Sequence, residues 1–202
     1  VTGVQTCALP ISKNPVIVLP DADLESASDV IVDGAFGCAG QRCLATSMAI
    51  VVGDAARPFT DAVRDKAGSR VTGNGLDEGV QMGPVITHDS RVRIEGLIEQ
   101  AIRDGARPVV DGRNARIPKH ERGSFVKPTV LEDLPFESPV ASTEIFGPVL
   151  TVHRVGDIDE AIARVNAGRY GNQASLFTTS GASARKFRYE AEVGNVGINI
   201  GV

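Results

Sequence analysis

The sequence is short of aromatic residues and cysteine, and these shortages exclude several kinds of protein. Aromatic residues make up 4% of the 202 positions, and tryptophan is absent. The three cysteines, Cys7, Cys38 and Cys43, are an odd and low number, which argues against a disulfide-built scaffold. Such usage is typical of a reducing compartment, and we therefore expect a cytoplasmic protein.

Long apolar runs, histidine clusters and an excess of basic charge are also missing. The longest apolar stretches, such as residues 48–52, fall far short of the roughly 20 residues that a membrane helix needs. The net charge of −4 argues against nucleic acid or anionic lipid as a partner. His88, His120 and His153 are far apart and show no ligand spacing, so we predict no metal site.

What the sequence does have is abundant glycine and a regular alternation of apolar patterns. We predict strands at residues 16–19, 48–52, 109–110, 125–131, 149–155, 173–178 and 196–200. Predicted helices follow Asp23, span residues 56–67, run between Thr87 and Gly105, follow Asp157, and span residues 182–192. This order predicts an α/β domain with a mostly parallel sheet flanked by helices.

The first twelve residues, VTGVQTCALPIS, do not share this pattern. They show no clear period, and the string is similar to translated sequencing-adaptor sequence. We interpret residues 1–12 as a non-native segment and give Cys7 no functional role; an ordinary polar arm is the alternative. Because the sequence stops on its last predicted strand, we also expect a truncation at the carboxyl end.

A glycine-rich segment, Phe-Gly-Cys-Ala-Gly-Gln-Arg-Cys at residues 36–43, joins a predicted helix to a predicted strand. A cysteine in such a loop can be exposed in a cleft beside backbone N–H groups. The thiolate is the nucleophile and an ordinary thiol has a pKa of about 8.5, so a nearby cation such as Arg42 would help. Cys43 is therefore a candidate nucleophile, with a buried packing role as the alternative. We expect Cys38 to be a packing residue, with a redox role as its alternative.

A second segment, Glu-Ile-Phe-Gly-Pro, occupies residues 144–148. Glu144 and Phe146 are two positions apart, so in an extended chain their side chains project to the same side. The carboxylate could accept hydrogen bonds from ribose hydroxyls, and the ring offers a flat apolar face. Without further context the alternatives are a solvated loop acid for Glu144 and a core residue for Phe146.

Together these segments resemble the aldehyde dehydrogenase superfamily. Residues 36–43 are similar to its catalytic-cysteine motif, and residues 144–148 to its cofactor motif. Further similar blocks occur in the same order: Leu-Pro-Asp-Ala-Asp (19–23), Met-Gly-Pro-Val (82–85), Tyr-Gly-Asn (170–172) and Val-Gly-Asn-Val-Gly-Ile-Asn (193–199). The resemblance covers residues 13–202. It implies an incomplete catalytic domain of the aldehyde dehydrogenase fold, without the dinucleotide-binding domain and the C-terminal segment.

Within that superfamily the sequence looks most like the methylmalonate-semialdehyde dehydrogenase branch, which is CoA-acylating. The similar features are the arginine directly before the cysteine, Asp-Gly-Arg at 111–113, and the segment 177–186. The resemblance implies Cys43 as nucleophile and Arg42 as an anchor for a substrate carboxylate. It implies Glu144 on the nicotinamide ribose and Phe146 against the nicotinamide side of the cofactor. It further implies NAD as cofactor, CoA as co-substrate, a small aldehyde as substrate and a homo-oligomeric parent.

The implied reaction is oxidation of a (methyl)malonate-type semialdehyde through a thioester on Cys43, with the acyl group passed to CoA. One alternative is a hydrolytic NAD(P)-dependent enzyme of another branch, and a second is a fragment that is inactive in isolation. A different cysteine enzyme, such as a thiol hydrolase, would need a histidine base that no motif places near Cys43. Hydrolytic relatives carry a general-base glutamate at a position that is Leu9 here, inside residues 1–12, so the choice between water and CoA stays open.

Overall fold

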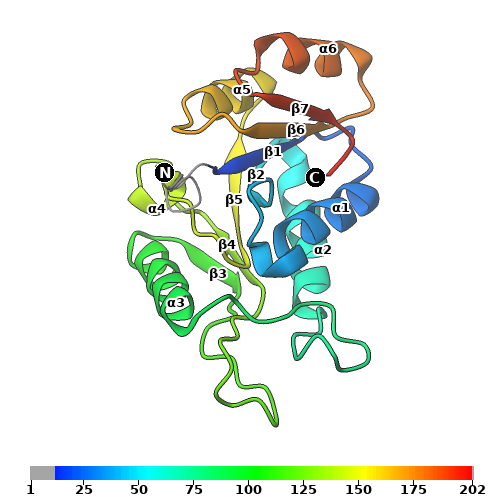
Figure 1. The fold of residues 1–202 in the computed structure, drawn as a ribbon. Helices are drawn as coiled ribbons and strands as arrows, with labels where there is room; N and C mark the ends of the chain where they lie inside the picture. The colour runs from blue at the N-terminus through cyan, green and yellow to red at the C-terminus, as the bar shows by residue number, and fades with distance from the viewer. Residues whose placement is uncertain (1–11, 202) are drawn as a thin grey trace, which may run out of the picture.

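The protein is described from a computed structural model, and the structure describes residues 12–201. These residues form one seven-stranded sheet in the order β3-β4-β5-β2-β1-β6-β7 (Figure 1). The strands are β1 Asn14–Val18, β2 Thr46–Val52, β3 Arg107–Val110, β4 Thr129–Glu132, β5 Val149–Val155, β6 Gln173–Phe177 and β7 Asn195–Ile198.

The sheet is parallel except at one edge. β1 pairs in parallel with β2 and β6, β2 with β5, β4 with β5, and β6 with β7; only β3 runs antiparallel, against β4. Parallel neighbours need crossover connections, and helices supply most of them. The predicted α/β architecture with a mostly parallel sheet is therefore confirmed.

Helices cover both faces of the sheet. They are α1 Leu24–Phe36, α2 Ala56–Gly68, α3 His88–Arg103, α4 Pro139–Ser142, α5 Ile158–Asn166 and α6 Gly181–Glu190, with short 3-10 turns at Gly37–Gly40 and Gly53–Ala55. In Figure 1, α1 and α2 lie beside the strands on one side, and α5 and α6 lie together beyond β6 and β7. The sheet is therefore enclosed, as parallel sheets generally are.

Side-chain caps fix where the main helices begin. The carboxylate of Asp23 accepts from the backbone N–H of Ser26 at 3.2 Å, and the Thr87 hydroxyl accepts from Ser90 N–H at 3.0 Å. Asp157 caps α5 in the same way. Each cap satisfies a backbone donor that has no partner within its helix, which stabilises the helix by about 1 kcal/mol. These starts were predicted from the sequence.

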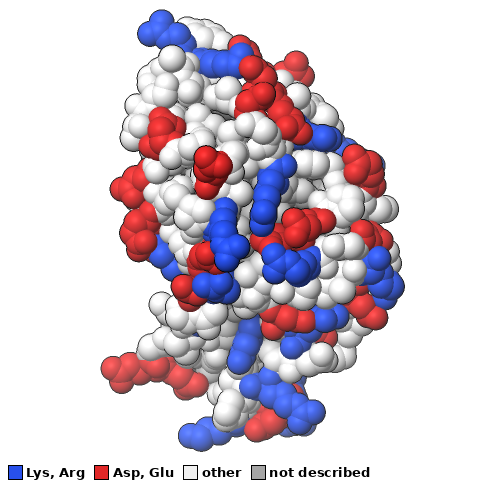
Figure 2. Space-filling model, turned by 180° about the vertical axis from the view of Figure 1, so that it is seen from behind, with Lys and Arg blue, Asp and Glu red and all other residues white. Residues whose placement is uncertain are grey.

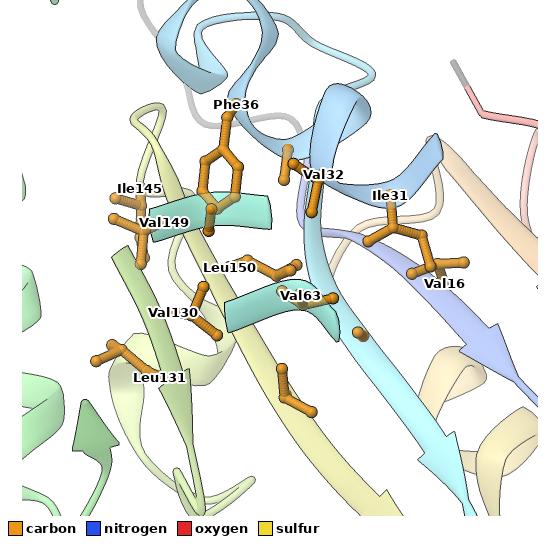
Figure 3. Close-up of a cluster of buried hydrophobic side chains, with 14 of the residues drawn as sticks. Val16, Ile31, Val32, Phe36, Val63, Val130, Leu131, Ile145, Val149 and Leu150 are labelled. Carbon is orange, nitrogen blue, oxygen red and sulfur yellow. The ribbon is translucent and has the colours of Figure 1, made fainter. Parts of the chain in front are cut away.

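The alternation of side chains along the strands divides the core into two layers. Val16 and Val18 of β1 belong to the cluster that packs against α1, α2 and α3, whereas Ile17 between them belongs to the cluster that packs against α5 and α6. Figure 3 shows the first cluster, in which Phe36 of α1 points toward Val149 and Leu150 of β5. Burying each such side chain contributes roughly 1.5–3 kcal/mol, so this layer holds α1 and its following loop in place.

Some predicted boundaries were wrong. Residues 125–128 of the predicted strand 125–131 are not in a strand, because Pro128 offers no backbone donor for a ladder and β4 begins only at Thr129. The short helix α4 was not predicted, since four residues carry no periodic pattern. The last strand ends at Ile198 rather than at residue 200.

The surface carries mixed charge. In Figure 2, acidic and basic side chains are interspersed over the face seen from behind. Within residues 12–201 no helix is both long and apolar enough to cross a membrane.

Candidate active site

The candidate residues meet at the amino ends of the parallel strands. Because β1, β2, β5 and β6 run in the same direction, the segments that precede them share one edge of the sheet. Cys43 lies three residues before β2, Glu144 and Phe146 shortly before β5, and Asn172 directly before β6. Topology therefore brings together two motifs that are far apart in the sequence.

The loop that carries Cys43 begins with an unusual left-handed turn. Cys38, Ala39 and Gly40 have φ values of +52°, +53° and +67° in succession. Residues with a Cβ rarely adopt this conformation, and each one costs of order 1–3 kcal/mol. A Cβ on Gly40 would also overlap the carbonyl oxygen of Gly147. The glycine thus lets the cysteine loop touch the backbone of the segment that carries Glu144 and Phe146.

Two side chains that directly follow the turn fasten it to neighbouring elements. The Gln41 amide accepts from the backbone N–H of Ile86 at 2.8 Å and donates to the carbonyl of Cys38 at 3.2 Å. This ties the loop to the Met-Gly-Pro-Val block at residues 82–85. Arg42 donates to the carbonyls of Asp33 and Gly34 at 3.3 and 3.0 Å, near the end of α1. The loop is therefore held by two different parts of the fold.

The backbone of Cys43 is held as well, while its side chain is exposed. Its carbonyl accepts two amide hydrogen bonds, one from Asn14 Nδ2 at 2.9 Å and one from Asn172 Nδ2 at 2.8 Å. Asn14 Nδ2 also donates to the carbonyl of Ala45 at 3.1 Å. An exposed thiol on a fixed backbone is the arrangement that a nucleophile requires.

The two side chains of the second motif, Glu144 and Phe146, differ in their exposure to solvent. Glu144 is partly buried and accepts from the Ser12 hydroxyl at 2.7 Å. Phe146 has a φ of +50° and is 41% exposed, which is unusual for an apolar ring. The carbonyl of Ile145 between them accepts from the Arg93 guanidinium of α3 at 2.5 Å. The strained backbone thus keeps an aromatic face at the surface, so the alternative of a core role for Phe146 is wrong.

A small cleft joins the two motifs. Arg42, Glu144 and Phe146 all line it, together with Ser12, Gly40 and the first residues of β2. Cys43 itself is not among the lining residues, although it is adjacent in sequence to Arg42. The structure therefore brings three of the four predicted site residues into one cleft, while the exposed Cys43 thiol is outside its lining.

Two ionisable groups are buried in the sheet region: Lys13, directly before β1, and His153, within β5. Burial lowers the pKa of Lys13 to about 8, against the attraction of Glu144, which raises it. Burial, together with the positive charges of Lys13 and Arg164, lowers the pKa of His153 to about 4. The His153 ring stacks on Phe136 with centroids 4.4 Å apart and is neutral at pH 7. Lys13 therefore supplies a buried positive charge that interacts with Glu144.

Two predictions need comment here. Cys38 is exposed rather than packed, because its left-handed backbone turns it out of the helix that precedes it. Leu9 and the rest of residues 1–11 lie outside the described residues. Of the segment interpreted as non-native, only Ser12 is described, and it is buried and donates to Glu144. The interpretation of residues 1–12 stays a prediction. Within residues 12–201, no group of three or more His, Cys, Asp or Glu side chains is arranged to hold a metal ion.

Sequence reasoning missed Lys13, Asn14 and the role of Asn172. Lys13 and Asn14 stand at the start of a strand, where a buried polar residue breaks the apolar pattern. That break in the apolar pattern is the signal that could have identified Lys13 and Asn14 from the sequence. Asn172 was noticed only as part of a motif, because nothing in its spacing shows that it would reach Cys43.

The fold and this site define a parallel α/β protein with an exposed cysteine at the amino ends of its strands. The sequence matches the model of the aldehyde dehydrogenase family over residues 7–202. The chain belongs to the aldehyde dehydrogenase family.

Curated relatives agree with the branch that the motifs indicated. The chain is 42% identical over 200 residues to the malonate-semialdehyde dehydrogenase of Halalkalibacterium halodurans, covering 99% of this chain and 41% of that protein. It is 39% identical over 189 residues to the acylating mitochondrial methylmalonate-semialdehyde dehydrogenase of Arabidopsis thaliana, covering 94% and 31%. The chain thus spans well under half the length of these relatives.

Solved structures confirm the fold. The methylmalonate-semialdehyde dehydrogenase of Oceanimonas doudoroffii superposes with a TM-score of 0.92 at 40% identity, covering 94% of this chain and 39% of that one. A candidate methylmalonate-semialdehyde dehydrogenase of Sinorhizobium meliloti 1021, solved with NAD, gives 0.93 at 36% identity, covering 95% and 39%. The described residues therefore have the fold of a part of these enzymes.

Proposed function

We propose that a full-length enzyme containing this chain oxidises a (methyl)malonate-type semialdehyde with NAD through a thioester on Cys43, and passes the acyl group to CoA. The observation that carries the proposal is the exposed Cys43 thiol on a loop held by hydrogen bonds to several separate elements. The names of the relatives supply the substrate class.

The chemistry follows from the thiol. The Cys43 thiolate attacks the aldehyde carbon, forming a C–S bond and an alkoxide that backbone N–H donors near the cysteine would stabilise. Loss of hydride from that carbon leaves a thioester. The thiolate of CoA then attacks the thioester carbonyl, the C–S bond to Cys43 breaks, and the acyl group leaves on CoA. A methylmalonate-derived acyl group would lose its carboxylate as CO2, take up a proton from water at the carbon that carried it, and leave as propionyl-CoA.

The residues that line the cleft suit a nicotinamide nucleotide in their donor and acceptor chemistry. NAD, when bound, would supply the acceptor for the hydride. The Glu144 carboxylate, which already accepts from one hydroxyl, can accept from ribose hydroxyls, and Phe146 offers an exposed ring face beside it. The backbone strain at Phe146 supports this role, because strain of this kind is found most often at functional sites.

Arg42 is the proposed anchor for the substrate carboxylate. A guanidinium can hold a carboxylate through two parallel charge-assisted hydrogen bonds. In this structure Arg42 lines the cleft but donates to two carbonyls of α1. Those bonds favour a competing role, in which Arg42 only fastens the cysteine loop to α1. The two roles predict different substrate dependence.

The nucleophile is tested by substitution in a full-length enzyme that contains this segment. Cys43→Ser should abolish dehydrogenase activity, because a hydroxyl without a strong base beside it is a far weaker nucleophile than a thiolate. Cys38→Ala is the matched control and should keep most activity, since it removes the other exposed thiol of the same loop. Activity of Cys43→Ser within a few-fold of wild type would refute the assignment.

The anchor is tested by comparing substrates with and without a carboxylate. Arg42→Leu should lower kcat/KM for methylmalonate semialdehyde by about 10- to 150-fold, or roughly 1.5–3 kcal/mol, and far less for propanal. Arg70→Leu is the matched control, because Arg70 also binds the end of α1, through Val32 and Asp33, but does not line the cleft. Equal losses on both substrates would leave Arg42 with the fastening role alone.

The acyl acceptor is tested by omitting CoA. With CoA as acceptor, steady-state NADH formation should depend on CoA after a first turnover. Turnover that continues at the same rate without CoA would favour the hydrolytic alternative.

A further inference from the structure

The carbonyl of Cys43 sits between two asparagine side chains that come from different parts of the chain. Asn14 is the first residue of β1, and Asn172 directly precedes β6. Their Nδ2 atoms lie 2.9 and 2.8 Å from the same oxygen. A carbonyl oxygen has two lone pairs, so these two donors saturate it. We call this arrangement the carbonyl clamp.

The orientation of both amides follows from chemistry. Among the described residues, each hydrogen-bond partner of the two Nδ2 atoms is a backbone carbonyl, which only accepts, so the nitrogen of each amide must face the cysteine loop. Asn14 is 1% exposed, so water does not compete for its hydrogen bonds. The clamp therefore connects a buried residue, Asn14, to the segment that carries the exposed thiol of Cys43.

Asn14 replaces a hydrogen bond that the sheet cannot make. Its neighbour Pro15 has no backbone N–H, and the pairing of β1 with β2 shifts register between these two residues. The Asn14 side chain bridges the carbonyls of Cys43 and Ala45, just before β2 begins. It thereby extends the pairing of the two strands past the irregularity, up to the cysteine itself.

Asn172 is fixed by its own backbone. Its carbonyl accepts from the backbone N–H of Asn195 at 3.1 Å, and the preceding carbonyl of Gly171 accepts from Gly194 at 2.8 Å. The start of β7 thus supports the start of β6, which supports Cys43. The starts of β1, β2 and β6 are thus linked through one carbonyl oxygen, and the start of β7 is linked to that of β6.

We propose that Asn14 and Asn172 are positioning residues that fix the peptide unit following Cys43 and thereby the direction in which its thiol is presented. The peptide group is planar, so fixing its carbonyl also fixes the adjoining backbone torsion of Cys43 and the N–H of Leu44. The proposal rests on the proposed function, in which Cys43 is the nucleophile. Reaction geometry is sensitive to small displacements, and a shift of about 1 Å can cost about 100-fold in rate.

The test is the single-turnover rate of hydride transfer in a full-length enzyme that contains this segment. Rates are compared on the alkaline plateau of each variant's pH profile, where thiol ionisation no longer limits them. Asn172→Leu should lower this rate by about 10-fold while NAD affinity stays within about two-fold, because only the approach geometry changes. Asn172→Asp keeps the shape of the side chain but places a carboxylate oxygen against the carbonyl oxygen of Cys43, so its rate should fall at least as much as that of Asn172→Leu. If Asn172 only fills space, the rate of Asn172→Asp should fall less than that of Asn172→Leu.

Further variants separate positioning from stability. Asn14→Leu should resemble Asn172→Leu, and the double variant should lose more than the product of the two single losses, because one remaining donor still orients the carbonyl. Asn166→Leu is the matched control: it removes a partly buried amide that binds the backbone of Glu190 and Glu192 and has no side-chain hydrogen bond to the cysteine loop. It should lower Tm and leave the rate within about two-fold of wild type. If Asn14→Leu fails to fold, the partly exposed Asn172 carries the test.

The outcomes distinguish the two proposals. If Cys43→Ser is inactive and both Asn172 variants transfer hydride within two-fold of wild type, the clamp is overturned and the nucleophile stands. If Cys43→Ser retains activity, the proposed function itself fails, whatever the asparagine variants do. We expect slow hydride transfer in both Asn172 variants, no activity in Cys43→Ser, and a hydride-transfer rate close to wild type in Asn166→Leu.

Discussion

The two ends of the parallel strands use polar side chains in opposite ways. At the carboxyl ends, Asp21 after β1 accepts from the hydroxyls of Thr178 and Thr179 and from the backbone N–H of Thr179, all at 2.8–3.0 Å. Asn199 bridges the backbone N–H and carbonyl of Thr178 at 2.8 Å each. At the amino ends, by contrast, polar side chains bind the backbone around Cys43 and leave its thiol exposed.

The difference supports the proposed placement of the active site at the amino ends. The network at the carboxyl ends is closed, since its donors and acceptors satisfy one another and stabilise the strand ends. The amino ends carry a left-handed turn, an exposed aromatic ring with a positive φ and a buried lysine. Ligands of open parallel sheets usually bind at the carboxyl ends. Here the exposed thiol is at the other edge, after three successive residues with positive φ, whereas the carboxyl ends have only single residues of this kind among those described, such as Asp133 and Asn199.

Gly40→Ala should produce the largest effect, because it breaks the contact between the two motifs at the amino ends. The new Cβ would overlap the Gly147 carbonyl at a φ of +67°, and we expect a loss of about 3–5 kcal/mol in the free energy of unfolding. Gly96→Ala is the control: its Cβ would meet nothing within 4 Å in the exposed middle of α3, and it should stabilise by about 0.5–1 kcal/mol. Urea denaturation measures both. An unchanged free energy of unfolding in Gly40→Ala would mean that the cysteine loop does not pack against Gly147 as described.

His153, which is buried between the two ends of the strands, should lower the stability of the folded protein as the pH falls. Its folded pKa of about 4 lies below the ordinary value of about 6.5, so the unfolded chain binds the proton first as the pH falls. This stabilisation is complete above pH 6.5 and should decrease by about 2 kcal/mol between pH 6.5 and 5. His153→Gln should flatten that part of the stability–pH profile. An unchanged slope in His153→Gln would show that other groups cause it.

Asp21→Ala should produce the smallest loss, at the carboxyl ends. Partial burial raises the pKa of Asp21, but hydrogen bonds from Thr178 and Thr179 outweigh this and hold it below its ordinary value. The stabilisation is therefore present above about pH 4 and is lost as the pH falls through the folded pKa. Because Asp21 is exposed, we expect a loss of only about 1 kcal/mol at pH 7.

Its control is Asp54→Ala, at the exposed carboxyl end of β2, which should change stability by less than about 0.5 kcal/mol. Hydride-transfer rates should stay at the wild-type value in both variants. A slowed reaction in Asp21→Ala would contradict the division of roles between the two ends.

Most of the fold could be predicted from the sequence, because local patterns and tertiary packing agree in it. The alternation of apolar residues placed β1, β2 and β5 to within two residues, and side-chain caps such as Asp23 and Thr87 marked helix starts. The failures have local causes. Pro128 shortened a predicted strand, and α4 is too short to show a period.

The candidate site was predictable in its residues but less so in its geometry. Motifs identified Cys43, Arg42, Glu144 and Phe146, and three of these line one cleft. The left-handed turn could not be predicted, because Cys38 and Ala39 have no intrinsic preference for it and tertiary packing imposes it. The carbonyl clamp depends on strand order, which no local pattern reveals.

The most direct test of the account is to trap the acyl group on the enzyme. A full-length enzyme containing this segment would be incubated with methylmalonate semialdehyde and NAD in the absence of CoA, and then digested for peptide mass analysis. The account predicts an acyl adduct on the peptide that contains Cys43, absent from Cys43→Ser and discharged when CoA is added. Formation of NADH with no adduct at Cys43, or with the adduct on another residue, would contradict it.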